Sequence, residues 1–286
     1  MKPCLVCAAV AFVAAVCAPV SAGAEVSAGT AALQAALRAE RLYDGDVDGV
    51  AGPMTRSAVR RLQARRGLVV DGIAGPRTRR ALGRRGRPDL GSRPLREGAR
   101  GWDVAALQFL LARHGFPSGA VDGGLGTRTA GALTRFQAWA GVAADGVAGP
   151  ATLGALRRAP PRSLLRFAWP VSAPLGDRFG PRGARFHTGQ DFPAPAGTRV
   201  AAAGYGCVES TGWNPGGYGN LVVIRHRLGM TSWYAHLAAI TVRRGTCLSA
   251  GDRVGSVGAT GNATGPHLHF ELRVRGAAVD PLTGVG

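Results

Sequence analysis

Near its C-terminal end the chain reads Gly265-Pro266-His267-Leu268-His269-Phe270-Glu271-Leu272. Apolar and polar residues alternate along this stretch, which is the two-residue period of a half-buried β-strand. His267 and His269 therefore leave the same face of the predicted strand. Such a pair can bind a metal ion, or it can be the polar face of an ordinary surface strand. The rest of the sequence decides between these two interpretations.

The first residues have the features of a secretory signal peptide. Lys2 precedes an apolar run over residues 5–20, and small residues follow at 21–24. This pattern predicts a signal peptide at residues 1–24, with cleavage after Ala22 as the alternative. A lipid anchor at Cys17 is disfavoured because Val16 stands where a small residue is expected. The run is too short and too alanine-rich for a membrane anchor, so we expect a secreted protein without stable membrane insertion.

Two cysteines remain beyond the predicted signal peptide, Cys207 and Cys247. An even pair in an oxidising compartment predicts one disulfide. Two buried free thiols are the alternative.

The net charge is strongly positive, +18 in 286 residues, and Lys2 is the only lysine. Such a surplus of arginine favours an anionic polymer or surface as a partner. A secreted protein rarely meets nucleic acid, so we expect anionic polymers of the bacterial wall instead. A basic surface that only keeps the protein soluble is the alternative.

Residues 31–156 contain an internal repeat with a constant offset of 74 residues. A repeat of this kind indicates two copies of one small module. In each copy, Asp-Gly pairs mark turns and Gly-Pro pairs place a proline where a helix can begin. Apolar residues at helical spacing follow, so each module is predicted to have three short helices. The matched positions are Leu33-Gln34 with Leu107-Gln108, Asp48-Gly49 with Asp122-Gly123, Gln63 with Gln137, Asp71-Gly72 with Asp145-Gly146, and Gly75-Pro76 with Gly149-Pro150.

This set of motifs resembles the three-helix peptidoglycan-binding domain of bacterial wall hydrolases, over nearly all of residues 28–157. The resemblance implies two all-α modules, at 28–84 and 99–158, that bind bacterial peptidoglycan. Segments rich in arginine, glycine and proline predict linkers at 85–98 and 159–166. The motif residues themselves fit turns, caps and core better than ligand contacts.

From residue 167 the pattern changes to short apolar runs separated by glycine clusters, as at 221–224 and 253–257. This predicts a mainly antiparallel β domain over 167–286. His187 and Asp191 lie in it, four residues apart and on one face if the backbone is extended. Together with one imidazole from the 267–269 pair they form a ligand set suited to catalytic Zn²⁺. The spacing leaves open whether His267 or His269 is the ligand, and the other imidazole could move protons with His236.

The segments around His187 and Asp191, Tyr234-Ala235-His236-Leu237, and the stretch at 265–271 together resemble the lysostaphin and LytM type of zinc metallopeptidase, peptidase family M23. The resemblance implies that His187, Asp191 and His269 bind one Zn²⁺. It also implies that His236 and His267 are the catalytic pair.

These features predict a monomeric, secreted or wall-associated zinc endopeptidase that cuts peptide bonds in peptidoglycan. A wall-binding scaffold or regulator without hydrolytic activity is the alternative. A transpeptidase with Cys207 as its nucleophile is disfavoured, because a disulfide with Cys247 would consume the thiol.

Overall fold

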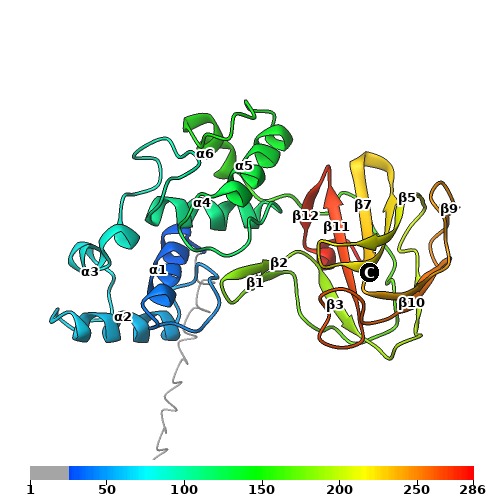
Figure 1. Ribbon diagram of the computed structural model, residues 1–286, viewed down its shortest axis with the longest axis horizontal. Helices are drawn as coiled ribbons and strands as arrows, with labels where there is room; N and C mark the ends of the chain where they lie inside the picture. Colours follow the sequence, from blue (N-terminus) through cyan, green and yellow to red (C-terminus); the bar gives the residue numbers. More distant parts are fainter. Residues whose placement is uncertain (1–25) are drawn as a thin grey trace, which may run out of the picture.

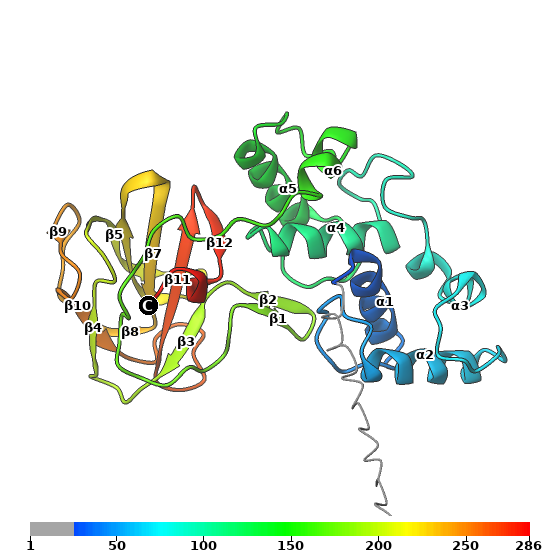
Figure 2. The same cartoon turned by 180° about the vertical axis from the view of Figure 1, so that it is seen from behind.

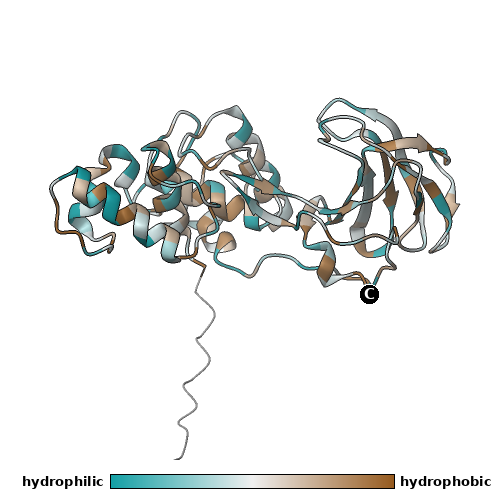
Figure 3. Cartoon of the chain, turned by 90° about the horizontal axis from the view of Figure 1, so that it is seen from below, coloured by the Kyte–Doolittle hydropathy of each residue, from teal (hydrophilic) through white to brown (hydrophobic). Residues whose placement is uncertain are grey.

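The computed structural model describes residues 26–286, so the predicted signal peptide at 1–24 lies outside the described residues. A helical N-terminal part lies beside a mainly antiparallel β C-terminal part (Figure 1). This arrangement confirms the predicted fold class. Hydrophobic segments run through both parts (Figure 3). Within residues 26–286 we find no helix with the length and apolar character needed to cross a bilayer.

Two sets of three helices form the N-terminal part, which confirms the predicted modules. Helices α2, α3 and α6 begin at the proline of a Gly-Pro pair. The missing N–H of a proline costs nothing at this position, because the first N–H groups of a helix have no partner within the helix. The first module contains α1 (Ala28–Ala39), α2 (Pro53–Arg65) and α3 (Pro76–Ala81), and the second contains α4 (Trp102–Arg113), α5 (Thr127–Ala140) and α6 (Pro150–Leu156).

The two modules share part of a hydrophobic core. Trp102, Ala106 and Phe109 on one side of α4 pack into the core beneath α1. Leu107 and Leu111, on the other side of α4, belong to the core of the second module. The predicted linker at 85–98 therefore joins two modules that are packed together.

A buried glutamine closes each Asp-Gly turn of the repeat. In the second module the amide nitrogen of Gln137 donates to Asp145 Oδ1 at 2.8 Å, to the Val147 carbonyl at 3.0 Å and to Thr152 Oγ1 at 3.0 Å. Its amide oxygen accepts from the Gly146 N–H at 2.9 Å. Gln34, Gln63 and Gln108 make the equivalent bonds at the other three turns. The recurring motif residues are therefore structural.

The C-terminal part contains three groups of strands. The main sheet has the order β12-β11-β7-β6-β5-β9, with β3 also paired to β11; β4, β10 and β8 form a second sheet, and β1 and β2 form a hairpin. The strands are β1 (Gly180–Arg182), β2 (Arg185–His187), β3 (Gln190–Pro193), β4 (Arg199–Ala201), β5 (Gly206–Asn214), β6 (Gly219–Arg225), β7 (Met230–Ala235), β8 (Leu237–Ile240), β9 (Cys247–Leu248), β10 (Arg253–Val257), β11 (His267–Val274) and β12 (Ala277–Val279).

Strand β11 is the predicted strand, and its apolar side chains Leu268, Phe270 and Leu272 are fully buried in the core. The prediction of a half-buried strand is wrong for the other face. His269 is only 6% exposed and Glu271 is fully buried, because other polar side chains cover them. A polar face that is withdrawn from water in this way must satisfy its own hydrogen bonds.

Cys207 and Cys247 form a disulfide, as predicted. The two residues lie opposite each other in the pairing of β5 with β9. The disulfide therefore ties the short edge strand β9 to the main sheet.

The β1–β2 hairpin projects from the β part and ends against both helical modules (Figures 1 and 2). At its tip, the Gly183 N–H donates to the Asp46 carboxylate at 2.6 Å, and the Gly183 carbonyl accepts from the Val47 N–H at 2.9 Å. The Ala184 carbonyl accepts from the Val121 N–H at 2.7 Å. One module supplies the first two partners and the other module supplies the third.

The buried glutamines give a test of the helical modules. We expect Gln137→Leu to lower the free energy of unfolding of the second module by about 2 kcal/mol, because it leaves partly buried turn groups without partners. Urea denaturation of the full chain measures this change. Arg128→Leu, at an exposed position of the same helix, is the matched control and should change stability by less than about 0.5 kcal/mol. Equal stabilities for the two variants would contradict the structural role.

Candidate metal centre

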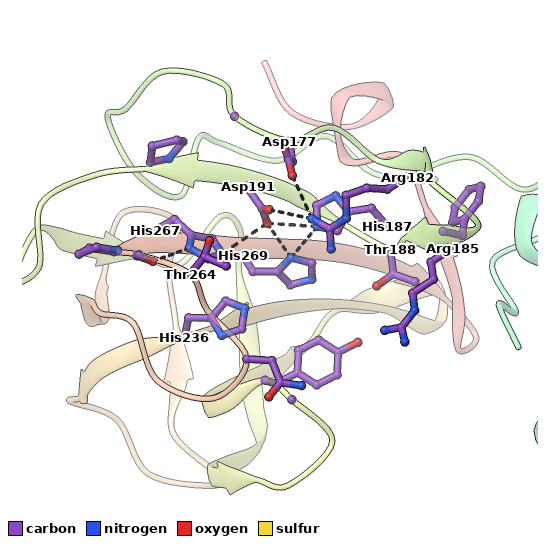
Figure 4. Close-up of a pocket in the computed structure, with 18 of the residues that line it drawn as sticks. Asp177, Arg182, Arg185, His187, Thr188, Asp191, His236, Thr264, His267 and His269 are labelled. Atoms are coloured by element: carbon purple, nitrogen blue, oxygen red, sulfur yellow. Dashed lines mark hydrogen bonds and ion pairs between the residues drawn. The ribbon is translucent and has the colours of Figure 1, made fainter. Parts of the chain in front are cut away.

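Three side chains from three strands converge on one point: His187 at the end of β2, Asp191 in β3 and His269 in β11 (Figure 4). His187 Nε2 lies 3.0 Å from His269 Nδ1, and Asp191 Oδ1 lies 3.2 and 2.8 Å from these two atoms. The pairing of β3 with β11 sets Asp191 directly opposite His269. Two imidazole nitrogens and one carboxylate oxygen are a donor set for a transition metal with a position left for water.

The second ring nitrogen of His187 and of His269 makes a hydrogen bond on the side that faces away from the point of convergence. His187 Nδ1 donates to the Arg178 carbonyl at 2.9 Å, and His269 Nε2 donates to Glu271 Oε1 at 3.0 Å. Metal-binding histidines are characteristically oriented in this way by an acceptor on the far nitrogen. The residues present therefore fit a metal ion.

Glu271 is the centre of a buried polar network behind His269. Its Oε1 accepts from Thr188 Oγ1 at 2.5 Å and from the Tyr218 hydroxyl at 2.8 Å, and its Oε2 accepts from Arg273 Nε at 2.7 Å. Burial raises the pKa of the Glu271 carboxyl, but the Arg273 charge and the hydrogen bonds from His269 and Arg273 outweigh burial and hold the pKa well below its ordinary value. The carboxylate is therefore ionised and accepts the imidazole N–H.

Asp191 is held in its ionised form by similar forces. Burial raises its pKa, but hydrogen bonds from His187 and His269 outweigh burial and hold the pKa well below the usual range. Metal binding requires a deprotonated carboxylate, and Asp191 has this form at neutral pH.

Two further imidazoles, His236 and His267, lie side by side next to this cluster, with ring centroids 4.7 Å apart. The Nδ1 atoms of His236 and His267 are hydrogen-bonded to the carbonyls of Thr260 and Gly265, at 2.7 and 2.9 Å. These bonds make Nδ1 the donor in each ring and leave Nε2 as the reactive nitrogen. Burial lowers the pKa of His236, which favours a neutral imidazole near pH 7.

The backbone of His236 is itself unusual. Its φ angle is 60°, in the left-handed region that costs energy for a residue with a side chain. Its N–H donates to the Tyr218 carbonyl at 2.9 Å, which helps to fix this conformation between β7 and β8.

All five predicted site residues line one open cavity of about 820 Å³. Arg182 and Arg185 line it as well, and Arg182 is paired with Asp177 at 3.0 Å. Gly216 and Gly217 form the turn between β5 and β6 and also face the cavity. The volume is sufficient for a short peptide segment.

His114 and His226, to which the sequence gives no role, lie elsewhere and are buried. His226 is bonded to the Tyr205 carbonyl and the Ser232 hydroxyl, both at 2.7 Å. Of the residues that orient the site, the sequence pattern missed Glu271 and the Arg178 carbonyl. Glu271 could have been found, because it has the same strand parity as His269.

Comparison with known proteins agrees with both parts of the structure. Residues 185–281 match peptidase family M23, and residues 27–82 and 100–156 match the family described as "Putative peptidoglycan binding domain". The C-terminal domain therefore belongs to peptidase family M23, and it is preceded by two domains of the peptidoglycan-binding family.

Individual relatives match the peptidase region. The DD-carboxypeptidase/endopeptidase Mpg of Neisseria meningitidis is 44% identical over 115 residues, which are 40% of this chain and 26% of that protein. The peptidoglycan DD-endopeptidase ShyA of Vibrio cholerae is 39% identical over 135 residues, which are 44% of this chain and 30% of that protein. The catalytic domain of lysostaphin from Staphylococcus simulans is 34% identical, with a TM-score of 0.37, over 38% of this chain and 90% of that structure. The chain thus spans about a quarter to a third of the length of the curated relatives from Neisseria and Vibrio.

The bond between Glu271 and His269 gives a test of the metal centre. We expect Glu271→Gln to weaken Zn²⁺ binding by about tenfold to a hundredfold, because the amide no longer fixes the tautomer and orientation of His269. Competition with a chromogenic chelator measures the affinity. Glu209→Gln, at an exposed position of β5, removes the same charge and should leave the affinity unchanged. Parent-like affinity in Glu271→Gln would show that the bond does not orient the ligand.

Proposed function

We propose that the protein is a secreted zinc endopeptidase that hydrolyses peptide bonds in peptidoglycan and is tethered to the wall by its two helical modules. The observation that carries this proposal is one cavity with a His-Asp-His cluster and two more imidazoles, in a chain that also has two peptidoglycan-binding domains. In this proposal the protein acts as a monomer in the periplasm or at the wall.

The five site residues divide into two roles. His187, Asp191 and His269 hold Zn²⁺, which when bound supplies a nucleophile at neutral pH and polarises the carbonyl of the scissile bond. Nε2 of the neutral His236 takes a proton during attack and returns it to the leaving amine. Nε2 of His267, when protonated, donates a hydrogen bond to the developing oxyanion.

D-alanyl to diamino acid cross-links are the first substrates to test, because the Vibrio relative is named a DD-endopeptidase and the Neisseria relative a DD-carboxypeptidase/endopeptidase. Glycine bridges are the second. Peptidoglycan is insoluble, and tandem weak binding modules on an enzyme raise its local concentration at such a polymer. The net charge of +18 adds attraction to anionic wall polymers.

Removal of the metal tests this proposal. We expect dialysis against a chelator to abolish the release of muropeptides from purified sacculi, and stoichiometric Zn²⁺ to restore it. Mass spectrometry of the released fragments identifies the bond that is cut. Full activity in the metal-free protein would refute a zinc mechanism.

Substitution of a catalytic imidazole is the companion test. His267→Ala should lower the cleavage rate by about 10² to 10³-fold, the usual contribution of one oxyanion donor, while Zn²⁺ affinity stays within a fewfold of the parent. His226→Gln, outside the cavity, is the control and should retain activity. If the parent binds sacculi and zinc but releases no fragment, the scaffold alternative replaces the enzymatic one.

A further inference from the structure

A second cavity, of about 670 Å³, lies between the second helical module and the peptidase domain. One wall comes from α5 and the residues after α4, including Arg135, Trp139 and Phe116. The other wall comes from the end of β11 and the turn that follows it, including Arg273 and Arg275. We call this cavity the interdomain groove.

Direct contacts fix the two walls of the interdomain groove relative to each other. The indole N–H of Trp139 donates to the Val274 carbonyl at 3.1 Å, and the Ala278 N–H donates to the Gly115 carbonyl at 3.2 Å. The Arg275 guanidinium lies over the Trp139 ring, 5.6 Å from its centroid. The shape of the interdomain groove is therefore set by contacts within the chain.

The charge of the interdomain groove is wholly positive. Three arginines line it and no acidic side chain does. Arg273 is neutralised by the buried Glu271. Arg135 and Arg275 are exposed, and within residues 26–286 neither has an ion pair or a side-chain hydrogen bond. Two guanidinium groups without acidic partners are suited to carboxylates, which they can bind through two parallel hydrogen bonds each.

The interdomain groove adjoins the catalytic cavity. Thr188 and Tyr218 line both. The Tyr218 hydroxyl accepts from Arg273 Nη2 at 3.0 Å, and the Tyr218 ring lies 5.8 Å from the ring of His269. In Figure 4, Thr188 and Arg185 lie on the side of the site that faces the helical part. An extended ligand that leaves the catalytic cavity on this side would reach Arg135 and Arg275.

We propose that the interdomain groove is a subsite for the carboxylates of a peptide stem, and that Arg135 and Arg275 bind them while the scissile bond lies at the metal centre. This inference rests on the proposed function, because it assigns part of the same substrate. It gives the second module a role in substrate recognition beside the peptidase site.

Binding of a defined fragment tests the subsite. The probe is the disaccharide tetrapeptide released from sacculi by a muramidase, compared with the same compound after amidation of its carboxyl groups. Titration calorimetry with the full chain carrying His267→Ala avoids turnover. We expect Arg135→Gln/Arg275→Gln to weaken binding of the free-carboxylate probe about tenfold, a loss typical of two partly exposed charge pairs.

A matched control separates the groove from net charge. Arg128→Gln/Arg244→Gln removes two exposed arginines outside the interdomain groove and should bind both probes like the parent. The single variant Arg135→Gln, which changes only the module surface, should already weaken binding if the double variant is unstable. Parent-like binding in the groove variants, or equal binding of the amidated and free probes, would overturn the subsite.

Two separate measurements distinguish the subsite from the proposed function. Zinc-dependent release of muropeptides by the unsubstituted chain tests the enzyme alone. If that release occurs and the groove variants bind the probe normally, only the subsite fails. If no release occurs under any zinc condition, the proposed function fails whatever the groove binds.

Discussion

The pairing of β11 with β3 on one side and β7 on the other is the constraint on which the site depends. Its register sets His269 opposite Asp191 and opposite Ala235, one residue before His236. A shift of one residue would turn every side chain of β11 to the other face. The hydrophobic side chains at 268, 270 and 272 prevent such a shift, because it would move them out of the hydrophobic core. The apolar face of β11 therefore fixes the register that positions the side chains of its polar face.

On the polar face of β11, His269 and Glu271 are buried, and this burial has energetic consequences. A buried carboxylate with all its oxygens bonded rigidifies its surroundings, whereas one that lacks a partner costs several kcal/mol. Glu271 meets this requirement with bonds from Thr188, Tyr218, His269 and Arg273. The cationic group of Arg273 also stacks on Trp233, 3.8 Å from the ring centroid. The network of hydrogen bonds around Glu271 therefore holds His269 in a fixed orientation at the candidate metal centre.

Much of this organisation could be predicted from the sequence, because it depends on local patterns. The 74-residue repeat, the Gly-Pro helix starts and the alternation at 265–272 predicted the modules and the central strand. The five site residues also came from short motifs, although only the family resemblance distinguished His269 from His267. Contacts between distant segments were beyond reach: the Arg178 carbonyl acts through the backbone, and no side-chain pattern marks it. The shared core around α4 was missed for the same reason, since Trp102 and Phe109 fit either module equally well.

Under the proposed function, the contacts of Gly183 and Ala184 with both modules affect how the protein moves over a wall. A flexible tether lets an enzyme sample a filled sphere around its anchor, with an average concentration that falls as the tether lengthens. The β1–β2 hairpin, held by hydrogen bonds to both modules, instead keeps the site at one distance and in one orientation from the modules. In this proposal, an enzyme with bound modules reaches mainly the bonds at that separation. Under the proposed function, advance to new bonds then requires release of the modules, so the rate of unbinding sets the time between cuts.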